Sequence, residues 1–496
     1  MAKKSVAKNY MYNLVYQVLI VILPIITAPY LSRVLGATKI GIYTYTYNIV
    51  SYFMLFGSLG VALYGKREIA YVQDDKKKRT QLFWEILVVK FITVTIATAI
   101  YVLVFIVLGK EYNIFYTILL FELLSTAVDI TWFFQGLEDF KKTVTRNVIV
   151  RLVAVTCIFV FVKKPEDILK YTLIYSLGNF LGNLSLWVYV PKFIKGEKVS
   201  SLDLKRHIVP LLVLFLPQIT DKIYNMMDTT MLGTMIKDKS EVGYYEQAQK
   251  IIRILNTVVA SLGIVMVPRM SNLFVSGGKD AVQDVLKKSF RYVFFISIPI
   301  VFGLLVVVDD FIPIFYGPSY ERTILIIKML SLVIFLMGIE NVIGSQYLIP
   351  TKQQKKYTIS VLVGLITNII LNYFLIKNFL ALGAAIATVL SQVIVDAIQL
   401  ASVKNEMSLK EMFKPVIKYL IFGLVMYLIC IGVKYLSHRF IILSKEIYTD
   451  IATVVLQIII GAISYILLLI GTKDELVTPV INKVLNKINK KVKEGE

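Results

Sequence analysis

The sequence predicts an all-α integral membrane protein with about fourteen transmembrane helices. Two observations lead to this prediction. Hydrophobic residues make up 57% of the 496 residues, and charged residues only 18%, against about 25% in soluble domains. The apolar residues also gather in long runs, and a soluble core stops growing near ~250–300 residues. Lipid must therefore surround most of the chain.

Runs near or above the ~20 apolar residues that span a bilayer occur throughout the chain. They cover residues 11–35, 40–65, 82–108, 112–136, 146–162, 168–191, 208–235, 242–267, 290–316, 322–349, 357–376, 382–403, 416–436 and 447–471. The alternation of polar and apolar residues that a strand would show is absent from them. Helices satisfy their own backbone hydrogen bonds in lipid, so each run predicts a helix.

The net charge of +21 is distributed as a membrane-topology signal. Connections after even-numbered runs, together with the two tails, hold about three times as many Lys and Arg as the opposite set. The extremes are Lys76-Lys77-Lys78-Arg79 and the C-terminal tail with Lys487, Lys490, Lys491 and Lys493. This placement excludes a nucleic-acid binder. It predicts a multi-pass protein of the cytoplasmic membrane with both termini in the cytoplasm.

A weak internal repeat divides the runs. Pro24, Leu35-Gly36 and Gly41-Ile42-Tyr43 have counterparts in Pro217, Leu232-Gly233 and Gly243-Tyr244-Tyr245. The second copy begins six helices after the first. Because six is even, both halves would enter the membrane in the same sense, with a pseudo-two-fold axis along the membrane normal. We expect an N-lobe at 1–207 (helices 1–6), a C-lobe at 208–403 (helices 7–12), and helices 13–14 with a basic tail at 404–496.

Several runs carry charged or amide side chains, although a charge at the bilayer centre costs at least ~2.5–3.5 kcal/mol. The seventh and eighth runs hold stripes at i, i+4, i+7 spacing, and single charges lie in the fourth and first. These residues are Asp221, Lys222, Asn225 and Asp228, then Glu246, Gln249, Lys250 and Arg253, then Glu122 and Arg33.

Two interpretations of these residues remain open. In the first, pairs such as Glu246–Lys250 and Asp221–Lys222 neutralise one another and only fix helix packing. In the second, the side chains line a hydrophilic cleft between the lobes, and its cations receive an anionic ligand. The guanidinium fork of arginine matches phosphate oxygens, and lysine acts as a point charge.

Metal and redox chemistry find no support in the sequence. Cys157 and Cys430 lie in separate apolar runs and are interpreted as small buried hydrophobes. His207 and His438 lie at run edges without metal-ligand spacing. We therefore expect no metal site and no catalytic residues.

Several motifs are similar to those of a known family. The segment from Asp129 to Glu138, DITWFFQGLE, resembles the signature at the end of the fourth helix in bacterial polysaccharide transporters, the Wzx-type flippases. Further matches are Pro29 to Gly36 (PYLSRVLG), Tyr64 to Ala70 (YGKREIA), Gly243 to Ala248 (GYYEQA) and Val267 to Met270 (VPRM). This family belongs to a superfamily with multidrug and toxin extruders and lipid-linked precursor flippases.

The resemblance implies a flippase without enzymatic activity. It implies two six-helix bundles plus two helices, alternating access, a cationic cavity, and an oligosaccharide on undecaprenyl diphosphate as substrate. Binding of diphosphate and sugars is then expected from Lys222, Lys250, Arg253, Arg33, Asn225 and Gln249. Na⁺ or H⁺ coupling is expected from Asp221, Asp228 and Glu122. Expected partners are membrane lipids, a polysaccharide polymerase and glycosyltransferases, for capsule, exopolysaccharide or teichoic-type polymers.

Two other functions were weighed against this one. A cation-coupled multidrug antiporter of the same fold would favour an excess of intramembrane carboxylates, whereas here acids and bases are mixed. A membrane-bound glycosyltransferase or ligase would need acidic motifs in a sizeable extracytoplasmic loop. The longest such connection, Lys434 to Glu446, is too short for that.

Overall fold

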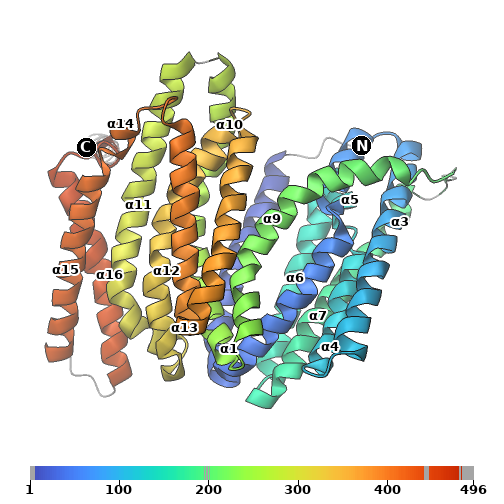
Figure 1. Ribbon diagram of the computed structural model, residues 1–496, viewed down its shortest axis with the longest axis horizontal. Helices are drawn as coiled ribbons and strands as arrows, with labels where there is room; N and C mark the ends of the chain where they lie inside the picture. The colour runs from blue at the N-terminus through green and yellow to red at the C-terminus, as the bar shows by residue number, and fades with distance from the viewer. Residues whose placement is uncertain are drawn as a thin grey trace, which may run out of the picture. The chain divides into compact units, whose positions relative to one another are not determined.

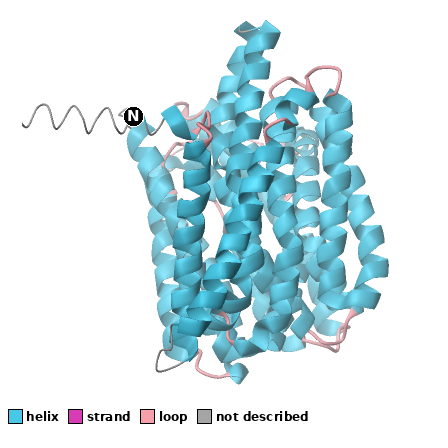
Figure 2. Ribbon diagram, turned by 90° about the vertical axis from the view of Figure 1, so that its left-hand side faces the viewer, coloured by secondary structure: helices cyan, strands magenta, loops and turns pink. Residues whose placement is uncertain are grey.

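The computed structural model of the chain describes residues 6–194, 196, 199, 201–276, 278–440, 446–479 and 482. Within these residues every regular element is a helix, and none is a strand (Figure 2). The predicted all-α fold is confirmed. The chain folds into two compact units, Met1–Gly243 and Tyr244–Glu496, and each is described by itself.

The first unit is built from nine helices and the start of a tenth. They are α1 (Val6–Ser58), α2 (Val61–Tyr71), α3 (Lys76–Tyr101), α4 (Asn113–Val128), α5 (Thr131–Gly136), α6 (Phe140–Phe161), α7 (Ile168–Ser185), α8 (Pro191–Ile194), α9 (Lys205–Met235) and the first residues of α10 (Ser240–Ser276). A π-helical turn, Val102–Val107, extends α3.

The second unit contains the rest of α10 and six further helices. They are α11 (Gly278–Phe315), α12 (Glu321–Glu340), α13 (Gln354–Val403), α14 (Leu409–Phe413), α15 (Val416–Phe440) and α16 (Glu446–Gly471). A π-helical segment, Asn341–Leu348, follows α12.

The longest helix of the first unit, α1, consists of two legs. A straight helix of its 53 residues would be about 80 Å long, far more than the ~30 Å hydrocarbon core. Gly36 interrupts it with φ 74° and ψ 167°. This conformation is open to glycine because it has no Cβ. The break falls between the first two predicted runs, which therefore form separate legs.

The 50 residues of α13 form a helical hairpin (Figure 1). The break is at Leu380, with φ 55° and ψ −133°. Gln399 Nε2 donates a 3.0 Å hydrogen bond to Ser360 Oγ. A Cβ on Gly364 would meet the side chain of Val395. Both pairs are centred within one residue of Leu380, as antiparallel legs require.

The number of helical legs agrees with the predicted number of runs. Among the described residues, ten segments are long and apolar enough to cross a membrane. Two of them, Ile22–Tyr71 and Gln354–Val403, each contain a second leg. The bent helix α10 is a further candidate span. The 31-residue helix α9 is not among these apolar segments, but it is long enough to cross and brings the number of helical legs to fourteen.

Connections after even-numbered and odd-numbered legs gather at opposite ends of the first unit. One buried cluster joins Phe83, Trp132, Phe133 and Phe193, which lie beside the connections after legs two, four and six. The other cluster contains Leu35 and Ile40 around the first break, with Ile158, Val162 and Ile168 from the connection after leg five. This alternation is what successive membrane crossings produce.

The second unit follows the same rule. At one end, Phe413 of α14 packs on Phe290 and Phe294 of α11, with ring centroids 5.3 and 5.5 Å apart. At the other end, Tyr320 stacks edge-on against Tyr244 at 5.7 Å. The predicted lobe boundaries at 207 and 403 remain predictions; α9 packs on α1 and α2 and lies in the first unit.

Candidate functional site: a polar cavity in the first unit

A ladder of polar contacts joins α7 to α4 inside the first unit. Asn179 Nδ2 donates a 2.9 Å hydrogen bond to Glu122 Oε1, and Asn183 Nδ2 donates one of 2.8 Å to Ser125 Oγ. One turn further, Trp187 Nε1 donates to the carbonyl oxygen of Val128 at 2.7 Å. Asn179 and Asn183 are four residues apart and share one face of α7, and Trp187 follows four residues later in the 3-10 turn Leu186–Tyr189 that continues α7.

This ladder borders two adjoining hollows of about 310 and 230 Å³. Ala62, Asp129, Trp132, Asn179 and Asn183 line both of them. Glu122 and Lys90 add charges to the smaller hollow, and Arg146 and Arg151 add charges to the larger. We call the two hollows together the polar cavity.

The end of α4 holds the lysine of this cavity. Lys90 on α3 is buried, and its Nζ donates a 2.6 Å hydrogen bond to the carbonyl oxygen of Asp129. Asp129 is the C-cap of α4 and has left the helical conformation, with ψ 113°. The last carbonyls of a helix have no intrahelical partner and attract cations. The lysine is therefore held by the helix end.

The DITW segment shapes the other wall. The carboxylate of Asp129 accepts a 2.9 Å hydrogen bond from the backbone N–H of Thr131. The hydroxyl of Thr131 in turn accepts one of 2.9 Å from Arg146 Nη2 on α6. Glu122 and Asp129 both line the smaller hollow.

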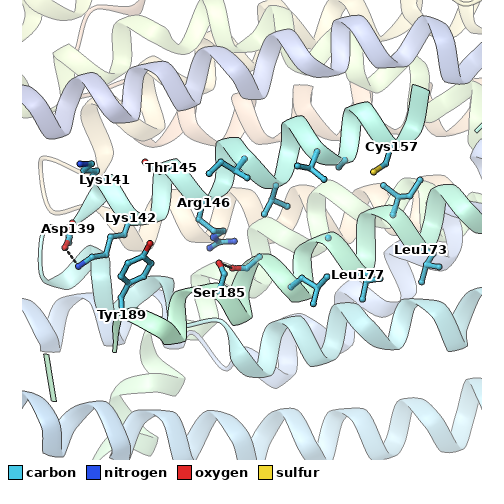
Figure 3. Close-up of a pocket in the computed structure, with 18 residues that line it drawn as sticks. Asp139, Lys141, Lys142, Thr145, Arg146, Cys157, Leu173, Leu177, Ser185 and Tyr189 are labelled. Atoms are coloured by element: carbon cyan, nitrogen blue, oxygen red, sulfur yellow. Dashed lines mark hydrogen bonds and ion pairs between the residues drawn. The ribbon is translucent and has the colours of Figure 1, made fainter. Parts of the chain in front are cut away.

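A groove between α6 and α7 begins where the polar cavity ends. It has a volume of about 940 Å³ and shares Arg146 and Val150 with the cavity. Figure 3 shows the basic side chains of Lys141, Lys142 and Arg146 at one part of the groove and Cys157, Leu173 and Leu177 further along it.

The other predicted site residues of the first unit are not among the residues that line the polar cavity. Arg33 is exposed and lies one turn before the break at Gly36. Lys222 and Asn225 are exposed on α9, whereas Asp228 is buried. The side chain of Asp221 lies outside the described residues.

In the second unit, the predicted stripe of α10 is partly accessible. Lys250 and Gln249 are half-buried, and Arg253 is exposed. The ion pair of this stripe differs from the expected Glu246–Lys250 pair, since Arg253 Nη2 lies 2.8 Å from Glu246 Oε1. Residues seven apart on a helix share a face, and the longer arginine side chain reaches across two turns.

Three cations of the polar cavity were missed from the sequence. Lys90 stands alone in the middle of its apolar run, which is the signal that could have found it. Arg146 and Arg151 lie near the start of the fifth run, where basic residues are ordinarily interpreted as interfacial. None of the three forms a stripe on its own helix.

The two histidines acquire acidic neighbours in the fold. His207 Nε2 lies 2.9 Å from Glu85 Oε2, and His207 Nδ1 lies 2.7 Å from the hydroxyl of Tyr64. In the second unit, ligand atoms of Asp310, His438 and Asp450 lie within 4.8 Å of one another. The ammonium of Lys434, 2.9 Å from Asp310, occupies the place of a cation there.

Helical legs that cross a membrane and enclose charged side chains define a polytopic membrane transporter fold. The lipid II flippase MurJ in an inward closed conformation matches with a TM-score of 0.74 at 17% identity, covering 94% of this chain and 100% of that one. An inward-facing multidrug resistance MATE family transporter matches with a TM-score of 0.57 at 12% identity, covering 82% of this chain and 95% of that one.

The chain belongs to the polysaccharide biosynthesis protein family, whose family model matches residues 6–274. The MatE family model matches residues 214–374. In sequence, the chain is 26% identical to the putative O-antigen transporter of Escherichia coli (strain K12) over 408 residues, which are 81% of this chain and 98% of that protein. The resemblance seen in the motifs is confirmed.

Proposed function

We propose that the protein is a flippase that moves undecaprenyl-diphosphate-linked oligosaccharides from the cytoplasmic to the outer leaflet by alternating access. The observation that carries this proposal is kinship to a putative O-antigen transporter over nearly all of that protein. The charged polar cavity inside an apolar bundle supports it. The polymer served is of the capsule, exopolysaccharide or teichoic type.

The physical task explains why charged side chains are needed. Each uncompensated sugar hydroxyl costs ~4–8 kcal/mol on transfer from water to hydrocarbon, so a multi-sugar head does not cross unaided. Amide, hydroxyl and charged side chains replace the lost water contacts. Two negative charges moving outward also gain ~4.6 kcal/mol per 100 mV of inside-negative potential, which favours export.

The proposed residues for binding the diphosphate are Lys222, Lys250 and Arg253. Arg33, Asn225 and Gln249 are proposed to contribute to binding of the diphosphate and the sugars. Arg33, Lys222 and Arg253 are exposed, so a ligand can approach their side chains. To bind a phosphate, the guanidinium of Arg253 would have to leave the carboxylate of Glu246. Carboxylate and phosphate oxygens are alternative partners of a guanidinium.

Coupling to H⁺ or Na⁺ is assigned to Glu122, with Asp221 and Asp228 as the other candidates. Glu122 is buried beside Asn179 in the polar cavity, where a carboxyl group can be neutralised by a proton or a cation. No other cofactor is proposed.

Accumulation of lipid-linked glycan in a deletion strain tests the function. Loss of the gene should trap the lipid-linked oligosaccharide on the cytoplasmic leaflet, and the intact gene should release it. A Lys222→Ala, Arg253→Ala double variant should restore less than a tenth of the export. Lys78→Ala is the matched control, because its side chain is 73% exposed in the first turn of α3. Normal export by the double variant would refute the anion-site assignment.

The second candidate is a cation-coupled multidrug antiporter, favoured by the match of the MatE model to residues 214–374. Dye efflux from cells that express the chain distinguishes the two functions. An antiporter would extrude cationic dyes and leave the accumulated glycan in place. A flippase would do the reverse.

The proposed location is the cytoplasmic membrane, with both termini and the even-numbered connections in the cytoplasm. Glycosyltransferases would then build the substrate on the same side as those connections, and a polymerase would use it on the other. These enzymes are the proposed partners, together with the surrounding lipids.

A further inference from the structure

The groove between α6 and α7 is amphipathic along its length. Its apolar part includes Ile149, Val153 and Leu181, which are 56%, 55% and 52% exposed. Its polar part contains the three cations Lys141, Lys142 and Arg146 and one carboxylate, Asp139 (Figure 3). An elongated molecule with an anionic end and a hydrocarbon chain is complementary to such a surface.

The length of the groove corresponds to one leaflet. Arg146 and Cys157 are eleven residues apart on α6, which is about 16 Å along a helix axis. Half of a ~30 Å hydrocarbon core is about 15 Å. A chain that starts at the cations would therefore reach the bilayer midplane at the far end of the apolar part.

The polar end of the groove holds more basic than acidic side chains. Lys142 Nζ lies 2.6 Å from Asp139 and 4.3 Å from the ring centroid of Phe193, so its position is fixed. Lys141 is exposed beside it. Three cations against one carboxylate leave an excess of positive charge, which suits a phosphate group.

The groove differs from an ordinary lipid-contact surface because two of its lining residues also line the polar cavity. Arg146 and Val150 line both the groove and the polar cavity. Gly182 permits this approach, because a Cβ there would lie 2.7 Å from Val150 Cγ2 and 3.4 Å from Arg146 Cδ. A phosphate bound at Arg146 would stand at the border between lipid and the polar interior.

We infer that the α6–α7 groove is a first docking site for a polyprenyl diphosphate lipid, separate from the anion-binding residues proposed above. In it the diphosphate lies at Lys141, Lys142 and Arg146, and the isoprenoid chain lies along Ile149 to Cys157. This inference rests on the proposed function and specifies where the lipid part of the substrate docks. The sugar head would face the polar cavity, while the tail stays in the membrane.

Photocrosslinking in nanodiscs tests the groove independently of transport. A benzoylphenylalanine replaces Leu181, which lines the groove, and in a second variant Leu184, which is also on α7 and 43% exposed but does not line it. The probe is radiolabelled undecaprenyl diphosphate in phosphatidylglycerol bilayers. The yield at position 181 should be at least tenfold that at position 184.

Competition and charge removal complete the test. Unlabelled undecaprenyl diphosphate should abolish the crosslink, extra phosphatidylglycerol should not, and a Lys141→Gln, Arg146→Gln double variant should lower the yield at least fivefold. Equal yields at the two positions, or equal competition by phosphatidylglycerol, would overturn the inference. Export in the deletion strain is scored separately: export without the crosslink rejects only the groove, and the crosslink without export rejects the flippase function.

Discussion

The side-chain amide of Asn179 donates a 2.9 Å hydrogen bond to the carboxyl group of Glu122, joining α7 to α4 inside the first unit. Glu122 is only 2% exposed and faces the smaller hollow of the polar cavity. A buried carboxyl group in a membrane protein is costly unless it has partners or a task. The amide can serve both the charged and the protonated form, because it donates to an oxygen that either form keeps.

Glu122→Gln should preserve this contact and remove the titration. A glutamine offers the same acceptor oxygen, so we expect a folded protein whose export falls about tenfold and no longer responds to the proton or sodium gradient. Export by inverted vesicles under imposed gradients measures this. Asn179→Ala is the control, since it removes only the donor, worth about 1 kcal/mol. Unchanged gradient dependence in Glu122→Gln would reject the coupling role.

More of the fold than of the candidate site could be predicted from the sequence. Long apolar runs can only be helices in lipid, and Gly36 between two runs indicates a break. The gap between the runs 357–376 and 382–403 likewise predicts the turn that the structure has at Leu380. The polar cavity takes single charges from separate helices, Lys90 on α3, Glu122 on α4 and Arg146 on α6. Spacing along the sequence identifies charges that share one helix. Charges on separate helices come together only in the folded structure, so their spacing in the sequence does not reveal them.

Glu85 should be a main stabilising residue of the first unit. It is 1% exposed and accepts hydrogen bonds from Gln81 at 2.7 Å, from the backbone N–H of Asp203 at 3.0 Å, and from Arg206. Its replacement removes the acceptor of these donors and the acidic partner of the buried His207. We expect Glu85→Ala to lower the free energy of unfolding by about 3 kcal/mol.

Thermal unfolding in detergent, followed by tryptophan fluorescence, measures the effect of Glu85→Ala. Glu68→Ala is a suitable control, because Glu68 pairs with Arg67 on the surface, where ion pairs contribute ~0–1 kcal/mol. Equal melting temperatures for the two variants would contradict the assigned role of Glu85.

Two helical glycines should respond in opposite directions to alanine. A Cβ on Gly383 would collide with the backbone carbonyl of Leu375 across the α13 hairpin, whereas a Cβ on Gly432 of α15 meets nothing within 4 Å. Gly383→Ala should cost ~1–3 kcal/mol through overpacking. Gly432→Ala should stabilise by up to ~1 kcal/mol through helix propensity. Melting temperatures of the two variants measure these effects. A shift of the same sign in both melting temperatures would contradict the contact in the α13 hairpin.

Stability should fall in acid through Glu406, which lies in the connection between α13 and α14. Burial alone would raise its pKa, but hydrogen bonds from Lys356, Gln353 and Tyr347 outweigh this and lower the pKa below its ordinary value of 4.5. A carboxyl group with a lowered pKa in the folded state stabilises the protein above its unfolded pKa. This stabilisation is lost as the pH falls below about 4.5.

The measurement for Glu406 is the melting temperature between pH 7 and pH 3. Glu406→Gln should melt lower at neutral pH, and its melting temperature should fall less between pH 5 and pH 3 than that of the unaltered protein. Parallel pH profiles of the two proteins would show that Glu406 contributes nothing to acid sensitivity.

The proposed orientation predicts which connections a membrane-impermeant thiol reagent reaches. In a chain with Cys157 and Cys430 replaced by serine, Lys78→Cys lies in the first turn of α3, next to the connection after the second leg, and Glu166→Cys lies in the connection after the fifth. The bias of Lys and Arg toward even-numbered connections places position 78 in the cytoplasm and position 166 outside. Labelling of intact cells should therefore modify only position 166, and position 78 should become reactive after permeabilisation. The two sites lie at opposite ends of one compact unit, so labelling of both from outside, or of position 78 alone, would reverse or refute the orientation on which outward flipping depends.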